Sequence, residues 1–363
     1  MRRRIHPGWR GLRSWQEAHH QNHPRPRAQV LEPVKATNKM TTESDKPATP
    51  PTSTQNELVA SSIRQFPQDQ EIELFRNWFQ KKYQDNLAGL VFFGSCLSEK
   101  SKSATSFKDF IAVVYDYRKT SRNPLKWLSH WTLPPDLFHL ALEENGRTHE
   151  CKYYLISTSQ LLDSVSDRAK DLYLLGRLSK RIAVIHARDD AALELLVRCQ
   201  TRAMQKAAEM ALAMLDSFDL ENFIKAVLRL SYLSETRLED ERKIDSLYEA
   251  HRQFYEQTYG MLLREMAGKK IIRPEGEKLW RVIGAKLPVG RRELEEILAQ
   301  SRKRAKARWP KMIITVDNWL DQLLAKLERT YGIKLEIPAW ERPVILITGW
   351  RHYFRLKRQG KIH

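Results

Sequence analysis

Two apolar runs, the second of which carries an acid, constrain the fold of this chain most. The first run is LAGLVFF (residues 87–93), and it stops at Gly94-Ser95. The second run is FKDFIAVV (residues 107–114), and Asp109 lies inside it. Apolar and β-branched runs of this length, bounded by small or polar residues, are typical of buried β-strands. The sequence therefore predicts two strands, with a glycine-serine pair after the first and a carboxylate on the second.

The pattern around these runs alternates between helix and strand. Helices are predicted over EIELFRNWFQKKYQ (71–84) and SQLLDSVSDRAKDLYLL (159–175), and strands over CKYYLIST (151–158) and RIAVIHA (181–187). From Asp189-Asp190 to about residue 265 the apolar periodicity is helical. This order predicts an α/β (α+β) fold, in which a mixed sheet with helices is followed by a helical domain.

The net charge of +18 is concentrated near the two ends of the chain. Nine basic and two acidic residues lie in residues 1–40, and the segments 301–312 and 351–363 carry six and five basic residues without an acid. Basic segments of this kind attract phosphate-rich partners such as nucleic acid or anionic lipid, although many charged runs are only solvated helix faces. No apolar run approaches the roughly 18 residues that a membrane-spanning helix needs, so any membrane contact is expected to be peripheral.

The last predicted helix, around residues 344–358, is amphipathic. Trp350 and Phe354 are expected on one side, and Arg351 and Arg355 on the opposite side. An aromatic face beside arginines suits a helix at a membrane surface, and it equally suits a helix that packs on its own domain.

Two interpretations of Gly94-Ser95 and Asp109 follow from their residue types. A glycine-serine pair at the end of a strand supplies backbone N–H groups and a hydroxyl to phosphate oxygens, and a carboxylate on the next strand reaches a divalent metal. Asp116, farther along the second strand, is a candidate second metal ligand. The alternative is an ordinary turn and an edge-strand acid.

Three cations extend the candidate site. Lys152, Arg177 and Lys180 lie close to strand ends in the same α/β unit, where they would neutralise a triphosphate. Without a bound phosphate, the same residues would simply be solvated bases.

Several spaced motifs in this region resemble one known family. They are Lys-Tyr at 152–153, IST at 156–158, LY at 172–173, GRL-x-K at 176–180, LRLSYLSETRLEDERK at 228–243 and FYEQTYGMLL at 254–263. Their order and spacing resemble the mitochondrial-type CDP-diacylglycerol synthases, a peripheral family that was first named for mitochondrial translocator assembly and maintenance. The resemblance covers residues 70 to 265.

The resemblance implies a domain organisation and a reaction. Residues 61–190 would be a nucleotidyltransferase-like domain and 191–270 a helical, winged-helix-like domain. The composition itself predicts that residues 1–60, which are rich in Pro, Thr, Ser and Gln, are a disordered extension, and that 271–363 form a basic helical region that could contact the membrane surface. The family joins CTP and phosphatidic acid to give CDP-diacylglycerol and pyrophosphate with Mg²⁺, in the biosynthesis of phosphatidylglycerol and cardiolipin. The implied location is the cytoplasmic or matrix face of a bacterial or mitochondrial inner membrane.

The resemblance also implies roles for individual residues. The catalytic and metal-binding set would be Asp109, Lys152 and Glu235, with Asp116 as the further metal candidate. The nucleotide-binding set would be Gly94, Ser95, Tyr173, Gly176, Arg177 and Lys180. The acceptor phosphate would meet Arg237 and Lys243, and the membrane would meet Trp350, Arg351, Phe354 and Arg355. Two positions depart from the family pattern: Cys96 stands where a glycine is common, and Glu235 stands where an aspartate is common.

Two other functions fit parts of the sequence. The same fold could act on RNA or protein, because basic tails suit RNA as well as lipid. A non-enzymatic module that binds nucleic acid or lipid would need only the basic segments. The absence of aromatic-rich RNA-binding strands and the aromatic-basic last helix favour a lipid acceptor over nucleic acid.

Overall fold

The computed structural model describes residues 54–97, 107–122, 124–167, 169, 171–234 and 241–315, and in the C-terminal segment residues 320, 321, 324, 328, 334–342 and 345–358. Residues 54–363 form one compact unit. Among the described residues, no helix is both long and apolar enough to cross a membrane.

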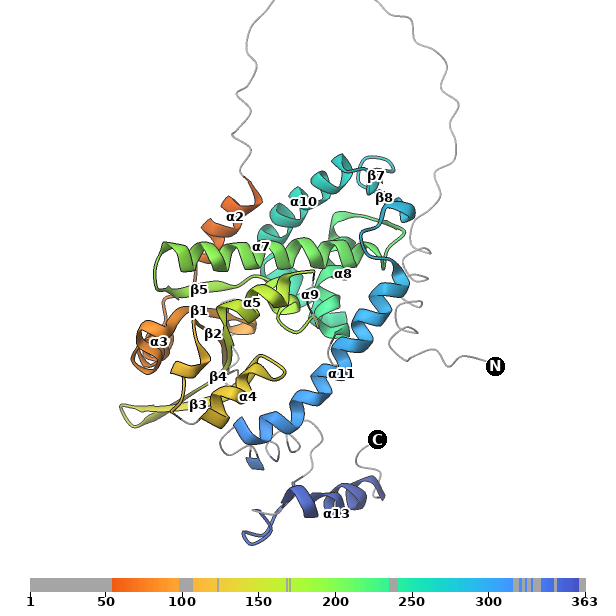
Figure 1. Cartoon of the computed structure of the whole chain (residues 1–363). Helices are drawn as coiled ribbons and strands as arrows, with labels where there is room; N and C mark the ends of the chain where they lie inside the picture. The colour runs from red at the N-terminus through yellow and green to blue at the C-terminus, as the bar shows by residue number, and fades with distance from the viewer. Residues whose placement is uncertain are drawn as a thin grey trace, which may run out of the picture. The chain divides into compact units, whose positions relative to one another are not determined.

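A five-stranded mixed sheet with helices packed around it forms one part of this unit (Figure 1). Its strands are β1 (Leu87–Phe93), β2 (Lys108–Val114), β3 (Asp136–Glu144), β4 (Arg147–Ser157) and β5 (Ala183–Ala187), in the order β3-β4-β2-β1-β5. Only β2 and β4 are paired in parallel; the other neighbours are antiparallel. The predicted strands β1, β2, β4 and β5 and the α+β class are confirmed.

Helix α3 (Gln70–Tyr83) covers one face of the sheet because its aromatic side chains repeat at helical spacing. The rings of Phe75 and Phe79 lie 5.7 and 5.8 Å from the ring of Phe110 on β2. Phe79 also packs edge-on against Tyr153 of β4, at 4.9 Å. These contacts form an aromatic core that holds α3 on this face of the sheet.

The opposite face is covered at one end by α5 (Thr158–Val165) and α7 (Asp190–Leu212). Gly89 of β1 allows α7 to come close, since a Cβ at this position would lie 2.7 Å from the Leu196 side chain. Residues 159–175 were predicted to form one helix, and the structure instead has α5 and then α6 (Leu175–Leu178). Ser166 ends the first of these helices because its backbone is extended.

The helical part of the chain continues through α8 (Leu220–Leu233), α9 (Glu241–Ala250) and α10 (Arg252–Gly268). A small sheet accompanies these helices, with β6 (Ser217–Phe218), β8 (Trp280–Val282) and β7 (Ile272–Pro274) in that order. The sequence did not predict this sheet, because its strands are only two or three residues long. The proposed domain boundaries stay a prediction.

Two further helices complete the described chain. Helix α11 (Arg291–Thr315) runs from the helical part back to the central sheet, where it contacts β3 (Figure 1). Helix α13 (Ile345–Arg358) lies near the C-terminus and coincides with the predicted amphipathic helix.

The prediction of disorder is wrong for the last residues of the predicted N-terminal extension. Residues 55–60 belong to α2 (Gln55–Ile63), which begins with a capping box between Thr54 and Glu57. The helix buries Val59 and Ile63, and it packs against α7 and α10. Residues 1–53 lie outside the described residues.

Candidate active site

The strand register places Asp109 in a row of side chains across the sheet. Asp109 pairs with Phe93 of β1 on one side and with Lys152 of β4 on the other, and Lys152 pairs with His139 of β3. Paired residues on neighbouring strands point to the same face, so the Asp109 carboxylate and the Lys152 ammonium share one face. Both side chains are half-buried, and Lys152 Nζ lies 4.6 Å from the centre of the Phe107 ring.

The loop after β1 approaches this carboxylate. Gly94 has a φ of +93°, which L side chains rarely adopt, and a Cβ added there would lie 3.1 Å from Oδ2 of Asp109. Ser95 follows directly and begins the short 3₁₀ helix η2 (Ser95–Leu97). The structure thus brings together the three residues Gly94, Ser95 and Asp109, which are the predicted phosphate cradle and metal ligand.

A second cluster lies on the same face, two positions farther along β4. Tyr154 follows Lys152 by two residues and therefore points to the same side of the sheet. The guanidinium carbon of Arg177 lies 4.9 Å from the centre of the Tyr154 ring and 3.8 Å from that of Tyr173. The ring of Tyr154 in turn lies 5.8 Å from Phe93, which pairs with Asp109. These aromatic contacts connect Arg177 to the row that contains Asp109.

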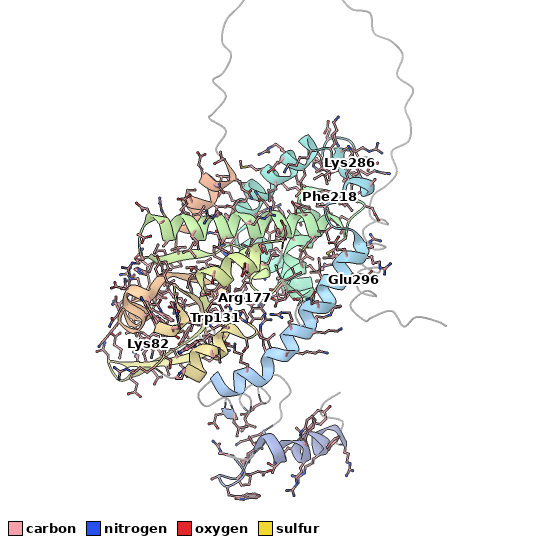
Figure 2. The ribbon with its side chains drawn as sticks, viewed as in Figure 1. Lys82, Trp131, Arg177, Phe218, Lys286 and Glu296 are labelled. Carbon is pink, nitrogen blue, oxygen red and sulfur yellow. The ribbon has the colours of Figure 1, made fainter. Side chains whose placement is uncertain are left out.

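Arg177 is held firmly in this position. Its side chain is in the interior of the unit, and the residue is only 9% exposed (Figure 2). Nη1 donates to the Tyr173 carbonyl at 2.7 Å, from the short helix α6. A buried arginine that stacks on two tyrosine rings has a fixed orientation, which suits the recognition of a phosphate group.

The remaining nucleotide-binding candidates lie where α6 meets α8. A Cβ on Gly176 would lie 2.8 Å from the Cβ of Ser231, so this glycine permits close helix packing. Lys180 Nζ lies 4.4 Å from the centre of the Tyr232 ring, near the C-terminal end of α8. The structure therefore shows a packing role for Gly176; its nucleotide contact stays a prediction.

Other predicted residues lie elsewhere. Lys243 is exposed on α9, and Glu235 and Arg237 lie outside the described residues. Asp116 does not join Asp109, because the five residue steps from Asp109 to Val114 alone span about 17 Å of extended strand. The Asp116 carboxylate instead caps the turn that follows, where hydrogen bonds from Arg118 lower its pKa. The hypothesis that Asp116 and Asp109 bind one metal ion is therefore wrong.

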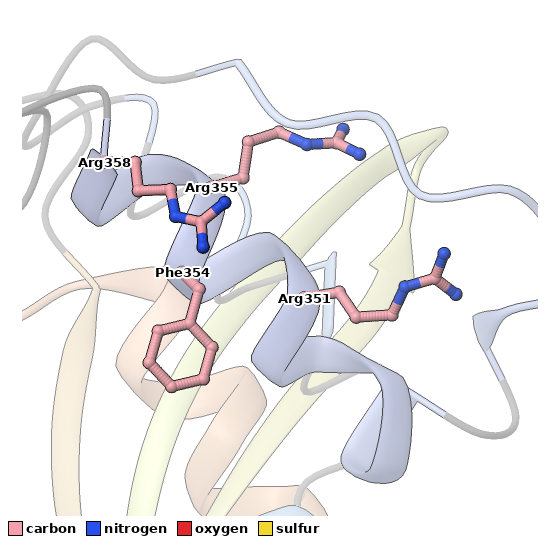
Figure 3. Close-up of a pocket in the computed structure, with 4 residues that line it drawn as sticks. All are labelled: Arg351, Phe354, Arg355 and Arg358. Carbon is pink, nitrogen blue, oxygen red and sulfur yellow. The ribbon is translucent and has the colours of Figure 1, made fainter.

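The predicted membrane-contact residues lie together on α13. Trp350 is 64% exposed and Phe354 is 56% exposed, and their rings are 6.3 Å apart. Arg351, Phe354, Arg355 and Arg358 line one open pocket (Figure 3). The aromatic and basic side chains are therefore adjacent on the helix, and not on opposite sides as the sequence suggested.

The basic run at 301–312 is not mainly a surface patch. Four of its six cations face the protein: Arg302, Arg304, Arg308 and Lys311. Arg304 and Arg308 both donate to Oδ2 of Asp171, at 2.7 and 2.6 Å. Burial would raise the pKa of Asp171, but Arg308 and Arg304 outweigh burial and hold this pKa below its usual value.

A mixed sheet with a glycine turn beside a strand carboxylate, and with cations on the neighbouring strand and helix, is the arrangement of a nucleotidyltransferase. The sequence from within β3 to within α11 agrees with this class. A model of the family described as mitochondrial phosphatidate cytidylyltransferase matches residues 138–309, a little under half of the chain, and this part of the chain is similar to that family. No curated protein matches the chain significantly.

The matched range contains only part of the site. It includes the Lys152, Tyr173, Arg177 and Lys180 positions, and it ends within α11 at residue 309. Gly94, Ser95 and Asp109 precede it, so their assignment depends on the geometry and on the resemblance in residues 70–137.

Proposed function

We propose that this enzyme transfers the cytidylyl group of CTP to phosphatidic acid, and so forms CDP-diacylglycerol and pyrophosphate at the matrix face of the mitochondrial inner membrane. The observation that carries this proposal is the close approach of Gly94 to the Asp109 carboxylate, in register with Lys152 on the parallel strand. The family match supports the choice of CTP and phosphatidate.

The residues of the site would act mainly by positioning and by charge neutralisation. The backbone N–H groups and the hydroxyl of Gly94-Ser95 would bind phosphate oxygens of the triphosphate. Lys152 and Arg177 would stabilise the negative charge that develops on the leaving pyrophosphate. A phosphate monoester is largely ionised at neutral pH, because its second pKa is near 6, so the acceptor needs no strong general base.

Mg²⁺ fits the donor set at this site. Magnesium ions in such enzymes are usually held by one or two carboxylates together with substrate phosphates and water. Asp109 supplies one half-buried carboxylate beside the phosphate-binding turn. Groups of three or more His, Cys, Asp or Glu that could hold a metal without substrate are absent from the described part of the chain. Asp109 would thus hold the ion, and the bound ion would supply neutralisation of the phosphate oxygens.

Helix α13 would bring the enzyme to its lipid substrate. The exposed Trp350 and Phe354 rings can enter the headgroup layer, and the adjacent arginines can pair with lipid phosphates. Each basic residue close to an anionic bilayer contributes about 1 kcal/mol to binding.

Pyrophosphate release from CTP tests this function. The full-length protein would be assayed with Mg²⁺ and phosphatidic acid in mixed micelles, and the lipid product would be identified by mass spectrometry. We expect lipid-dependent release of pyrophosphate that falls at least a hundredfold in Asp109→Asn, because the metal-binding carboxylate is removed. The matched control is Asp163→Asn, which removes the same charge from an exposed position on α5.

Two results would contradict the proposal. Turnover that does not depend on lipid, with CTP still bound, would point to an RNA or protein acceptor. Unchanged activity in Asp109→Asn would show that the carboxylate does not hold the metal.

A further inference from the structure

Arg308 on α11 is a buried cation with one unused donor. The residue is 6% exposed. Its Nε and Nη2 donate to the Pro134 carbonyl at 3.2 and 2.7 Å, and Nη2 also donates to Asp171. Nη1 is buried and has no hydrogen-bond partner in the described part of the chain. A buried donor without a partner is energetically unfavourable, and more so when the group is charged.

The position of Arg308 is next to the candidate site. Its guanidinium carbon lies 4.5 Å from the centre of the Tyr173 ring, and the guanidinium carbon of Arg177 lies 3.8 Å from that same centre. One aromatic ring therefore contacts two arginines. One arginine comes from the predicted nucleotide site and the other comes from a helix about 130 residues later in the sequence.

The charges around Tyr173 favour an anion. Asp171 is shared between Arg304 and Arg308, so one carboxylate pairs with two guanidinium groups. Oδ1 of Asp171 accepts a hydrogen bond from the Tyr173 backbone N–H at 3.0 Å. This bond fixes the backbone of Tyr173 next to the carboxylate that pairs with Arg304 and Arg308. Phosphate oxygens match the planar fork of a guanidinium group, and charge-assisted hydrogen bonds to them are strong.

We propose that Nη1 of Arg308 donates to a phosphate oxygen of a bound substrate, so that α11 forms one wall of the active site. This proposal rests on the proposed function, because it requires phosphates at the Tyr173–Arg177 cluster. The phosphate group has two possible sources, the triphosphate of CTP or the phosphomonoester of phosphatidic acid. Arg308 would then be a substrate-binding residue. The sequence alone does not reveal this role, because α11 is far from the rest of the site along the chain.

The substitution Arg308→Lys tests the inference in the full-length protein. It keeps the positive charge and removes the planar fork that carries Nη1. The matched control is Arg302→Lys, because Arg302 lies on the same helix and donates to the Leu233 carbonyl at 3.0 Å. Three quantities would be measured: the Kd of CTP and the Kd of inorganic tripolyphosphate by calorimetry without lipid, and the KM of a short-chain phosphatidic acid.

The two phosphate sources give different results. If Nη1 binds the triphosphate, Arg308→Lys raises the Kd of both CTP and tripolyphosphate at least tenfold. If it binds the lipid phosphate, both Kd values stay within twofold and the KM of phosphatidic acid rises at least tenfold. Arg302→Lys is expected to change each quantity less than twofold. A folded Arg308→Lys protein with all three quantities unchanged would overturn the inference, since Nη1 would then not contact a substrate phosphate.

A measurement on the parent protein avoids any folding defect of the variant. Amide hydrogen exchange in residues 300–312 is expected to slow when CTP or short-chain phosphatidic acid saturates the enzyme. Unchanged exchange in this segment with both ligands present would also overturn the inference. If the parent binds CTP and tripolyphosphate but shows no lipid-dependent turnover, the proposed function fails, while the Kd comparison and the CTP-dependent exchange still decide the role of Arg308 toward the triphosphate.

Discussion

Gly94 is the residue at which the backbone of this site is most constrained. Its φ of +93° lies in the left-handed region, and the Asp109 carboxylate occupies the space that a side chain would need. The positive φ and the lack of space for a side chain both apply to residue 94. The turn can therefore present its N–H groups beside the carboxylate only if this residue lacks a Cβ.

The substitution Gly94→Ala is expected to lower kcat/KM at least tenfold, because the new methyl group displaces Asp109 and strains the turn. Strain of this kind costs about 1–3 kcal/mol, so the fold should survive. The control is Gly146→Ala, at φ +72° in the β3–β4 turn, where a Cβ would have no heavy atom within 4 Å. Thermal unfolding and kcat/KM would be measured for both variants. Equal losses of kcat/KM in the two variants would refute a special role for residue 94.

Local sequence signals were sufficient for some residues of the site and insufficient for others. Gly94, Ser95 and Asp109 could be predicted because a strand end and the next strand are close in the sequence. The prediction that Asp116 binds the same metal ion as Asp109 was wrong, because each residue along an extended strand lies farther from the strand's first residue. Arg308 could not be assigned to the site, because a basic run has the same appearance whether its side chains face solvent or a buried carboxylate.

Among the elements, β3 was missed although the sequence contains a signal for it. Asn145 and Gly146 join β3 to β4, and both have positive φ, at 52° and 72°. An Asn-Gly pair between two strands is the strongest short-range signal of a β-hairpin. The strand itself, DLFHLALEE, includes four charged or histidine residues, and this composition hid its character. Without β3, the attachment of α11 to the sheet could not be foreseen.

The junction between α9 and α10 makes stability depend on pH. His251 lies at this junction, where burial and then the charge of Arg181 lower its pKa from 6.5 to about 4. The unfolded chain therefore binds the proton more tightly than the folded protein does. The stability that neutral His251 contributes is complete above pH 6.5 and is lost as the pH falls toward 4.

We expect the free energy of unfolding to fall by about 1–2 kcal/mol over this interval on account of His251, after allowance for its partial exposure. Urea unfolding at a series of pH values would measure the decrease. In His251→Gln the decrease in the free energy of unfolding should be smaller by this amount, about 1–2 kcal/mol. The contributions of all other groups are common to both proteins and cancel in the comparison. Parallel curves for parent and variant would show that His251 does not contribute.

For the molecule as a whole, the proposed catalysis and the proposed membrane attachment use different parts of the chain. The sheet, α6 and α11 hold the proposed nucleotide site, and α13 carries the exposed aromatic rings and the arginine-lined pocket. Substrate binding in solution and binding to a bilayer are therefore expected to be separable.

Deletion of residues 344–363 is expected to reduce partitioning onto vesicles that contain phosphatidic acid at least tenfold, while the Kd of CTP changes less than twofold. A full-length double variant, Trp350→Ala with Phe354→Ala, tests the aromatic contribution without loss of charge. Vesicle co-sedimentation and calorimetry would measure the two affinities. Equal weakening of both, or of neither, would mean that α13 has only a structural role.

Helix α11 also determines how this protein can move. It is bonded to the end of α8 through Arg302, to the segment just before β3 through Arg308 and Lys311, and to Asp136 at the start of β3 through Lys311. The nine residue steps from Arg302 to Lys311 form a rod about 14 Å long, at 1.5 Å per step. A rod that is bonded at both positions is expected to resist a hinge-like separation of the sheet from the helical part. We therefore expect substrates to enter through local rearrangement of the connecting loops, with the spacing between the two halves kept during turnover.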